Sequence, residues 1–458
     1  MLQSLKTYTR DKLVSYLLSL ATSSSDETLI KMTHLMELIP KKEYYKDRIR
    51  WIRELIRTKH PSIAFPRRIL RDLHPNQRDK WITNLAVNHL LSGTNRRKEW
   101  ADRHGFYPPS TMVISVTMRC NLSCYGCYAG DYNKSLELSL EEIDGVLTQM
   151  KEMGIYFAVI SGGEPFFMDG IFELFKKHSD MAFLVFTHGG LIDEAMVQRL
   201  IEVGNVMPAF SLEGYRHETD ERRGAGHFDK VLHAMRLLRE NGLSFCGSFT
   251  HSSKNTAIIT DPTYIDFLLE QGVFALWLFS YVPVGREPNP DLMPSPEQRD
   301  RLRRATVEFR ATRPMLFVDF WNDGPIISGC IAGGRKYVHI NANGDIEPCV
   351  FCHFAVDNIR RSSLQEALGS PLFRKIREKQ GEHDNLLRPC MLIDHPDYGR
   401  EFFASEGAYP THEGAETIFT TLAERMDNYA RSYGEIADQA WEEEFKGHPV
   451  RQRTTGKR

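Results

Sequence analysis

The sequence predicts an α/β fold: a partial (β/α)6 TIM-type barrel with a helical N-terminal domain and a cysteine-rich C-terminal extension. Three observations predict it. Short β-rich runs alternate with amphipathic helical stretches in residues 106–325. Residues 1–105 contain helical patterns and few β-rich runs. Residues 326–400 gather glycine and cysteine around a hairpin pattern. A C-terminal helical segment is expected over residues 401–458, with a closing helix pair over residues 411–445.

The composition is that of a globular protein with metal sites. The chain has 458 residues, of which 41% are hydrophobic and 26% charged, enough for a buried core. No apolar run approaches the roughly 18 residues that cross a bilayer. Lys6, Arg10, Asp11 and Lys12 interrupt residues 1–20, which therefore lack the apolar stretch of a signal peptide. We expect a cytoplasmic protein, in which 8 cysteines indicate metal binding rather than disulfides.

The N-terminal domain is basic although the net charge of the chain is −2. Residues 1–105 contain 21 Lys and Arg against 11 Asp and Glu, a difference of +10. A solvated helical surface is the plainer interpretation, and a peripheral membrane contact through "RIRWIRELIR" (Arg48–Arg57) is the sharper one. We expect no nucleic-acid partner. Helices are predicted in three stretches, punctuated by Pro61 and Pro66: Asp26–Leu38, Lys41–Arg57 and Pro75–Leu91.

The barrel elements follow in strict alternation. The predicted strands are Met112–Thr117, Tyr156–Ser161, Phe183–Thr187, Val206–Leu212, Ser244–Thr250 and Ala275–Tyr281. The predicted helices are Leu138–Met153, Leu191–Val203, Phe228–Asn241, Thr263–Gln271 and Glu297–Arg310. This alternation indicates a parallel sheet with helices outside it. Because the active sites of such barrels lie at the C-terminal ends of the strands, the segment after the first strand is expected there.

Three cysteines occupy that segment. Cys120, Cys124 and Cys127 have the spacing Cys-x3-Cys-x2-Cys in "MRCNLSCYGCYAG". Three thiolates on one short loop can bind three irons of a [4Fe–4S] cluster, which leaves the fourth iron for an outside ligand. A structural zinc ion normally takes four ligands, so this loop fits zinc poorly.

This loop resembles that of radical S-adenosylmethionine (SAM) enzymes. The resemblance implies that the fourth iron binds SAM, that one electron cleaves SAM to a 5′-deoxyadenosyl radical, and that this radical abstracts hydrogen from a substrate. It also implies a low-potential electron donor of the flavodoxin or ferredoxin type. The family usually has an aromatic residue where this chain has Gly126, and Tyr125 or Tyr128 is expected to pack there instead. Tyr128 is also expected among the residues that bind SAM.

Further motifs follow in the family's order. In "SGGEP", Gly162 and Gly163 are expected to approach the SAM amino group, with Glu164 and Pro165 shaping the turn. "FTHG" places His188 at the pocket, either as a polar substrate contact or as a packed side chain.

The resemblance extends to two later stretches. In "FSLEG", Ser211 is expected to contact SAM and Glu213 holds the acidic position; Arg223 would bind the SAM carboxylate. Arg222 is equally well explained as a solvent-facing residue at a helix start. "YVPVG" is expected against the adenine through Tyr281, Pro283 and Val284.

A second cysteine set lies in residues 326–400. A hairpin is predicted from Lys336–Ile340 through a turn at Asn343-Gly344. Its pattern resembles the SPASM and twitch extensions of radical SAM enzymes, which implies an auxiliary iron–sulfur extension. Too few cysteines are present for a two-cluster SPASM domain. One further [4Fe–4S] cluster, or a zinc site instead, would use Cys330, Cys349, Cys352 and Cys390.

Two ligand assignments stay open. If Cys352 is not a ligand, His353 is a possible substitute or the cluster keeps an open iron. Cys246 is expected to be a buried apolar residue.

The substrate is not identified by the sequence. The first hypothesis is a hydrophobic or membrane-associated small molecule, such as a lipid chain or a tetrapyrrole, in keeping with the basic N-terminal helices. The alternative is a peptide-modifying, maturase-type enzyme, although no winged helix is visible in residues 1–105. A third hypothesis is a non-catalytic iron–sulfur protein.

Overall fold

The computed structural model describes residues 24–38, 43–380, 382 and 384–445. A ten-stranded sheet with the order β11-β9-β8-β1-β2-β3-β4-β5-β6-β7 organises this part of the chain. Its parallel strands are β1 Met112–Thr117, β2 Phe157–Gly162, β3 Ala182–Thr187, β4 Val206–Leu212, β5 Cys246–His251, β6 Ala275–Ser280 and β7 Leu316–Asp319. The predicted strands are therefore present, and β7 is an additional one.

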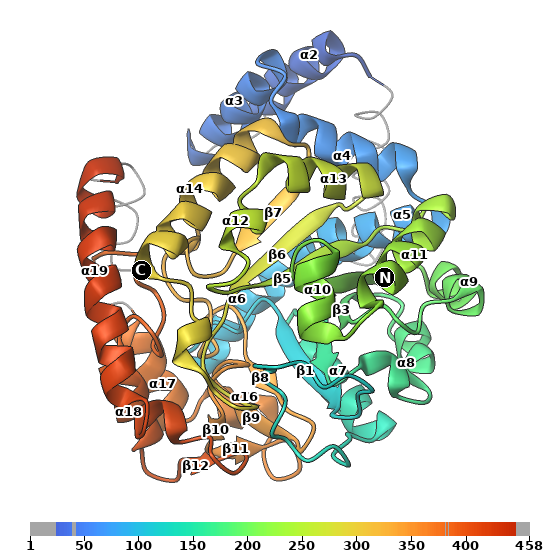
Figure 1. Ribbon diagram of the computed structural model, residues 1–458. Coiled ribbons are helices and arrows are strands. Elements are labelled where there is room, and N and C mark those ends of the chain that lie inside the picture. Colours follow the sequence, from blue (N-terminus) through green and yellow to red (C-terminus); the bar gives the residue numbers. More distant parts are fainter. Residues whose placement is uncertain (1–23, 39–42, 381, 383, 446–458) are drawn as a thin grey trace.

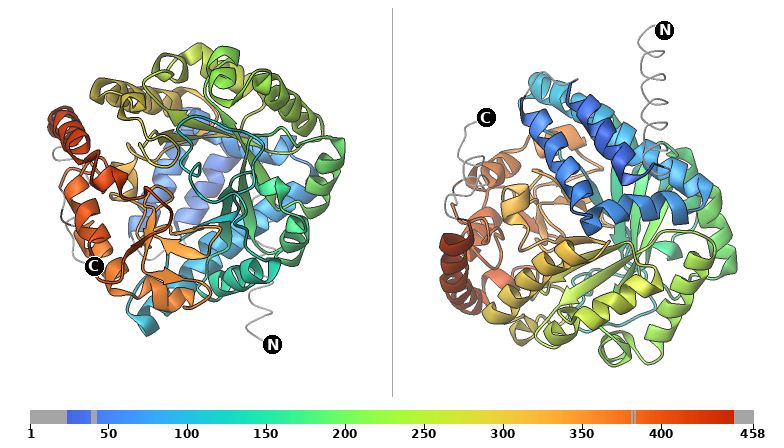
Figure 2. Two further views of the ribbon diagram at one scale, coloured as in Figure 1. Left: turned by 60° about the horizontal axis from the view of Figure 1, so that its bottom comes forward. Right: turned by 90° about the horizontal axis from the view of Figure 1, so that it is seen from above.

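Helices enclose this sheet (Figure 2). Those that follow its strands are α7 Leu140–Glu152, α8 Ile171–Lys177, α9 Glu194–Val203, α10 Arg216–Arg223, α11 His227–Glu240, α12 Thr256–Ile259, α13 Pro262–Gln271, α14 Pro296–Thr312 and α15 Gly324–Ile327. Local chemistry explains their starts. A capping box between Ser139 and Glu142 begins α7, and another between Ser295 and Gln298 begins α14. The apolar faces of these helices pack on the sheet in one large core.

The sheet is curled into a partial barrel. Phe186 of β3 lies 6.2 Å from Trp277 and 5.7 Å from Phe279 of β6, measured between ring centroids. In a flat sheet these strands would be about 14 Å apart, since neighbouring strands are separated by about 4.8 Å. The α/β barrel predicted from the alternation is therefore confirmed.

The N-terminal helices cover the end of the barrel at which the strands begin (Figure 1). They are α2 Asp26–Glu37, α3 Glu43–Arg57, α4 Pro61–Asp72, α5 Pro75–Trp81, the π-helix Ile82–Gly93 and α6 Thr94–His104. Of these, α2 to α4 are drawn in blue at the top of Figure 1. Pro61 begins α4 and Pro66 lies inside it, so Pro66 does not end a helix as predicted. Lys41 lies outside the described residues, as do residues 1–20 and 446–458.

Part of the basic charge is used for this packing. Arg68 donates to the carbonyl oxygens of Val273 and Pro314, and Arg97 donates to that of Gly154 at 2.6 Å. These contacts satisfy carbonyl groups of the loops below the strands. Such arginines are part of the barrel floor and are not available to an acidic partner.

The C-terminal extension lies at the opposite end, beside β1 (Figure 1). The predicted hairpin is present as β8 His339–Ile340 and β9 Asp345–Glu347, with Gly344 at φ +84°. Strand β8 also pairs in parallel with β1. The remaining elements are β10 Phe354–Ala355, β11 Asp357–Asn358, α16 Leu364–Leu368, α17 Pro371–Lys379, α18 Pro396–Phe403, β12 Tyr409–Pro410 and α19 Ala423–Glu444.

The helix pair predicted over 411–445 is wrong. Strand β12 pairs with β10, and Gly414 has φ +80°, which ends regular structure before a helix can form. Only α19 follows as an α-helix in that described segment. No helix in the described ranges is long and apolar enough to cross a membrane.

Candidate functional site

A cavity of about 730 Å³ opens at the C-terminal ends of the barrel strands. Both cysteine sets line it: Cys120, Cys124, Cys127, Cys330, Cys349, Cys352 and Cys390. Cys246 is absent from this lining and is 1% exposed in an apolar cluster, as predicted. Of the residues expected to bind SAM, six also line the cavity: Tyr128, Gly162, Gly163, Ser211, Arg223 and Tyr281.

The other expected SAM residues lie behind the cavity wall. Glu164 is fully buried and accepts hydrogen bonds from Thr187 Oγ1 at 2.9 Å and from the His188 amide at 2.8 Å. Burial raises the pKa of Glu164 to about 7. Its carboxyl group thus joins the ends of β2 and β3, in keeping with the turn-shaping role expected for it. Pro165, Glu213, Pro283 and Val284 are likewise not part of the cavity lining.

Gly162 and Gly163 hold the cysteine loop. A Cβ atom on Gly163 would lie 2.3 Å from the Arg119 carbonyl oxygen, and one on Gly162 would lie 2.2 Å from that of Thr117. The Gly163 amide donates to the Thr117 carbonyl at 2.7 Å. The Gly163 N–H group is therefore not free to bind a ligand. An ammonium group of a ligand donates hydrogen bonds, so this turn could bind it only through a backbone carbonyl oxygen.

Two arginines share one carboxylate beside the loop. Glu213 Oε1 accepts from Arg223 Nη2 at 2.6 Å and from Arg222 Nη1 at 2.8 Å. Arg222 also donates to the carbonyl oxygens of Tyr125 and Gly126, each at 3.2 Å. Two guanidinium ions against one carboxylate leave a net positive charge at the cavity, which suits an anionic ligand group.

The surface role considered for Arg222 is therefore wrong. Arg222 and Arg223 are the last residues of α10, not a helix start, and their side chains are only 10% and 12% exposed. The contact of Arg222 with the cysteine loop could not be predicted from local patterns, because Arg222 lies 96 positions after Gly126 in the sequence.

Tyr281 occupies the place beside Gly126. A Cβ atom on Gly126 would lie 2.6 Å from Tyr281 Cε2, and Gly126 has φ +59°. The aromatic residue next to the third cysteine thus comes from the end of β6 and not from Tyr125 or Tyr128, which corrects the prediction. Tyr128 instead bonds through its hydroxyl to Ser161 Oγ at 2.7 Å.

Specific contacts position the second cysteine set. Tyr337 Oη donates to Cys349 Sγ at 2.7 Å, and the Cys390 amide donates to Asp394 at 2.9 Å. Asp394 forms a fully buried ion pair with Arg299. The alternative ligand His353 does not line the cavity; its ring bonds to the Val350 carbonyl and to His412, so it is not positioned as a substitute.

These cysteines fit clusters better than single ions. Among the described residues, no group of three His, Cys, Asp or Glu side chains is arranged to hold one metal ion. Zinc would need its ligands at about 2.3 Å from a single centre. Burial raises the pKa of Cys330 to about 11 and that of Cys352 well above its ordinary value. A bound metal would therefore be needed to make them thiolates.

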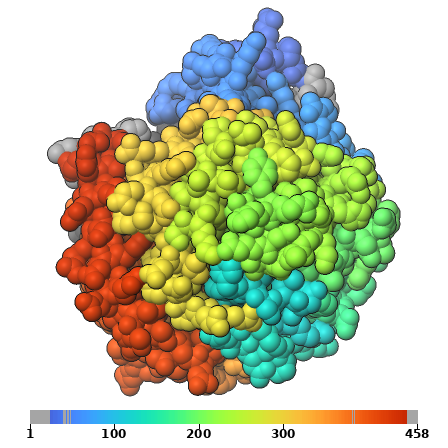
Figure 3. Space-filling model, viewed as in Figure 1, coloured from blue at the N-terminus to red at the C-terminus, as the bar shows by residue number. Residues whose placement is uncertain are grey.

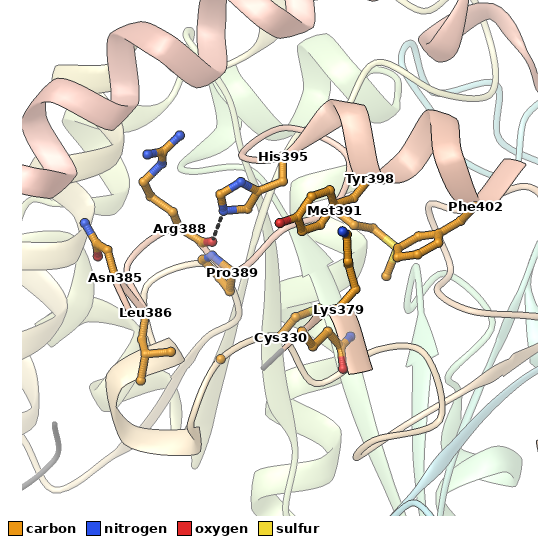
Figure 4. Close-up of a pocket in the computed structure, with 12 residues that line it drawn as sticks. Cys330, Lys379, Asn385, Leu386, Arg388, Pro389, Met391, His395, Tyr398 and Phe402 are labelled. Carbon is orange, nitrogen blue, oxygen red and sulfur yellow. Dashed lines mark hydrogen bonds between the residues drawn. The ribbon is translucent and has the colours of Figure 1, made fainter. Parts of the chain in front are cut away.

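A second, small hollow lies behind Cys330 (Figure 4). It lies between α17, α18 and the segment from Asn385 to Met391, where His395 Nε2 bonds to the Arg388 carbonyl at 3.0 Å. Its volume of about 20 Å³ has room for about one water molecule. Of these two hollows, only the large cavity has room for a substrate beside the cysteines.

Two family models match this chain. The model of the radical SAM superfamily matches residues 114–252, and that of an iron–sulfur cluster-binding domain, SPASM, matches residues 330–391. The first contains the loop with Cys120, Cys124 and Cys127, and the second contains Cys330, Cys349, Cys352 and Cys390.

Individual relatives agree with these matches. The Fe-coproporphyrin III synthase of Methanosarcina barkeri is 33% identical over 180 residues, which are 38% of this chain and 45% of that enzyme. The chain therefore spans less than half the length of this relative. The PqqA peptide cyclase of Granulibacter bethesdensis is 27% identical over 308 residues, covering 63% of this chain and 80% of the cyclase.

The fold also matches a solved structure. That of Streptococcus suis SuiB bound to S-adenosylmethionine superposes with a TM-score of 0.54 at 19% identity. The match covers 66% of this chain and 76% of SuiB. At this identity the likeness establishes the fold alone.

Proposed function

We propose that this chain, a radical SAM protein with a C-terminal SPASM iron–sulfur domain, cleaves SAM reductively and abstracts a hydrogen atom from a substrate held between its two cysteine sets. A [4Fe–4S] cluster supplies the electron for that cleavage when bound. The observation that supports the proposal most is that both cysteine sets line one cavity.

The chain's own residues would divide the work. Cys120, Cys124 and Cys127 would bind the first cluster, and Arg222 would fix the loop that carries them. Arg223 would pair with the SAM carboxylate, for which a bidentate guanidinium is well suited.

Three further groups complete the assignment. Ser211 and the turn at Gly162-Gly163 would contact the rest of SAM, with Tyr281 against its adenine. The second cluster would be bound by the SPASM cysteines: Cys330, Cys349, Cys352 and Cys390.

The Arg222 and Arg223 variants should fail in different ways. Arg223→Ala should keep the iron and weaken SAM binding roughly ten- to a hundredfold, because a charge-assisted pair contributes about 1.5–3 kcal/mol. Arg222→Ala should lose iron from the first cluster, because two loop carbonyl groups lose their donor. Iron analysis and anaerobic equilibrium dialysis with SAM measure both. Equal iron content and equal SAM affinity in the two variants would refute this division of roles.

For the substrate, a small apolar molecule is the first candidate. One relative is named as a synthase of Fe-coproporphyrin III, a tetrapyrrole. No relative reported above is named for a lipid. A peptide is the second candidate, because the PqqA peptide cyclase matches over a longer segment.

Substrate-dependent turnover tests the proposal. Reduced protein should release 5′-deoxyadenosine slowly without substrate and faster with a true substrate, and deuterium from the substrate should appear in the 5′-deoxyadenosine. Tetrapyrroles and peptides are the two classes of candidate substrate to test in this assay. If no 5′-deoxyadenosine formed under any of these conditions, the result would support the third hypothesis, a non-catalytic iron–sulfur protein. The electron donor is proposed to be a flavodoxin or ferredoxin, which should replace dithionite in this assay.

A peripheral membrane contact is proposed for the hairpin of α2 and α3, drawn in blue at the top of Figure 3. It exposes Leu35, Leu38 and Trp51 by 66%, 80% and 63%. Helix α3 packs against α2 and α4, with Ile56 buried.

Vesicle sedimentation measures this contact. Anionic vesicles at low salt should bind the protein, salt should release it, and Trp51→Glu should reduce binding. Arg50 and Arg53 both pair with Glu37, so we expect the apolar residues to contribute more than these charges. Absence of binding at low salt would remove the membrane contact.

A further inference from the structure

An aromatic wall lines the same cavity as the two cysteine sets. It consists of Phe186 in β3, Trp277 and Phe279 in β6, and Phe320 directly after β7. The rings of Phe279 and Phe320 stack with centroids 4.6 Å apart and planes 14° apart. Those of Trp277 and Phe320 stack at 5.6 Å and 27°. The wall thus presents nearly parallel rings from the neighbouring strands β6 and β7, with Phe186 of β3 edge-on to Trp277 and Phe279 at 86° and 72°.

These aromatic side chains are only partly buried although they lie within the barrel. Apolar surface left in contact with water lacks the stabilisation that its burial would give. A concentrated apolar surface inside a cavity is typical of a ligand site. The wall therefore favours a flat apolar ligand that covers it.

Hydrogen-bond donors without a partner accompany the wall. His188, Ser280 and Trp321 line the cavity and are at most 5% exposed. Their donor atoms, His188 Nε2, Ser280 Oγ and Trp321 Nε1, form no hydrogen bond with the described residues, although His188 Nε2 lies 3.4 Å from Glu164 Oε2. Each follows a wall residue by one or two positions in the sequence. A buried donor without a hydrogen bond is unfavourable, and an acceptor on a ligand would remove that cost.

The tautomer of His188 makes it a donor. Its Nδ1 accepts from the Gly190 amide at 2.9 Å, so the proton of the neutral ring lies on Nε2. Burial lowers the pKa of this histidine to about 4, which keeps the ring neutral. All three groups therefore offer N–H or O–H bonds to acceptors on a ligand.

We propose that the substrate is a planar, multi-ring, apolar molecule with carboxylate or carbonyl groups at its edge. The proposal rests on the proposed function and specifies its substrate class. The ring system would stack on Phe279 and Phe320, and the edge acceptors would bond to the donors that flank the wall. Since the adenine of SAM is also flat, the decisive question is whether such a molecule binds together with SAM.

Coproporphyrin III is a suitable probe, because its ring system is flat and apolar and carries carboxylates at its edge. Full-length protein with its clusters, oxidised so that SAM stays intact, would be titrated with the porphyrin at saturating SAM. The Soret band and tryptophan fluorescence report binding. Cholate, a non-planar apolar carboxylate, tests the need for planarity.

We expect the porphyrin to bind with SAM present, and cholate to bind about tenfold more weakly or worse. Phe320→Ala and Trp321→Phe should each weaken porphyrin binding about tenfold, the first by losing a stacking face and the second by losing only an N–H donor. Trp441→Phe is the matched control. Trp441 is buried on α19, outside the cavity, and its Nε1 also has no partner among the described residues.

The inference would be overturned if the Soret band did not change up to about 100 µM porphyrin, which corresponds to weak binding, or if SAM displaced the porphyrin. It would also be overturned if cholate bound as tightly as the porphyrin, or if Phe320→Ala bound the porphyrin as tightly as the wild type. Release of 5′-deoxyadenosine is measured on the same preparations. If it persists while porphyrin binding fails, the substrate class is wrong and the proposed radical SAM activity stands.

Discussion

Replacing Cys120, Cys124 and Cys127 together by alanine is expected to abolish SAM cleavage and to remove about half of the iron. The wild-type protein should hold about eight irons, four in each of two cubane clusters. The variant should keep about four, because the SPASM cysteines are untouched. Iron and sulfide analysis, together with chromatography of 5′-deoxyadenosine after dithionite reduction, measures both effects.

Cys246→Ala is the matched control for this variant. Cys246 is a buried thiol of the same barrel that lies outside the cavity, so its removal should leave iron content and SAM cleavage unchanged. Equal SAM cleavage by wild type and the triple variant would refute the first cluster assignment. A wild-type protein that saturates at about four irons and contains zinc would refute the second.

Local patterns in the sequence were sufficient to predict the barrel. Strands β1 and β4 have the predicted bounds, Met112–Thr117 and Val206–Leu212, because apolar runs bounded by turn residues are visible along the chain. The hairpin turn at Asn343-Gly344 is also local, since Gly344 adopts the positive φ that such turns require. Each of these elements is specified within a few residues.

Pairings between distant segments could not be predicted in this way. Strand β8 has two residues, and its place beside β1 depends on a register with Val113 and Ile114 more than two hundred positions earlier. Strand β7 is similarly short, at four residues, and pairs with β6. Elements of this length have too little pattern of their own, so tertiary packing decides them.

The site residues divide in the same manner. The cysteine spacing and "SGGEP" are local motifs, whereas the aromatic wall joins three strands. A signal for part of the wall was present: Trp277 and Phe279 alternate in "ALWLFS", which places both on one face of β6. No local signal connects them to Phe320, because this stacking follows from the pairing of β6 with β7, in which Leu278 lies opposite Asp319.

A bulky residue at Gly126 should be damaging because Tyr281 already fills that space. In Gly126→Phe, the new Cβ atom would lie 2.6 Å from Tyr281 Cε2. Overpacking costs typically 1–3 kcal/mol, and a side chain at φ +59° adds roughly 1–2 kcal/mol. Because the strain falls on the residue before Cys127, we expect SAM cleavage to drop about a hundredfold or more.

The double variant Gly126→Phe/Tyr281→Ala separates these two costs. Removing the tyrosine ring makes room for the introduced one, so the overpacking should be relieved while the strain at positive φ remains. We expect roughly ten- to a hundredfold of the lost SAM cleavage to return, and a double-mutant cycle should give a coupling of about 1–3 kcal/mol. Tyr281→Ala alone measures the loss of the ring. Additive losses in the double variant would mean that the two positions do not share one space, and the assignment of Tyr281 as the aromatic partner of the cysteine loop would be wrong.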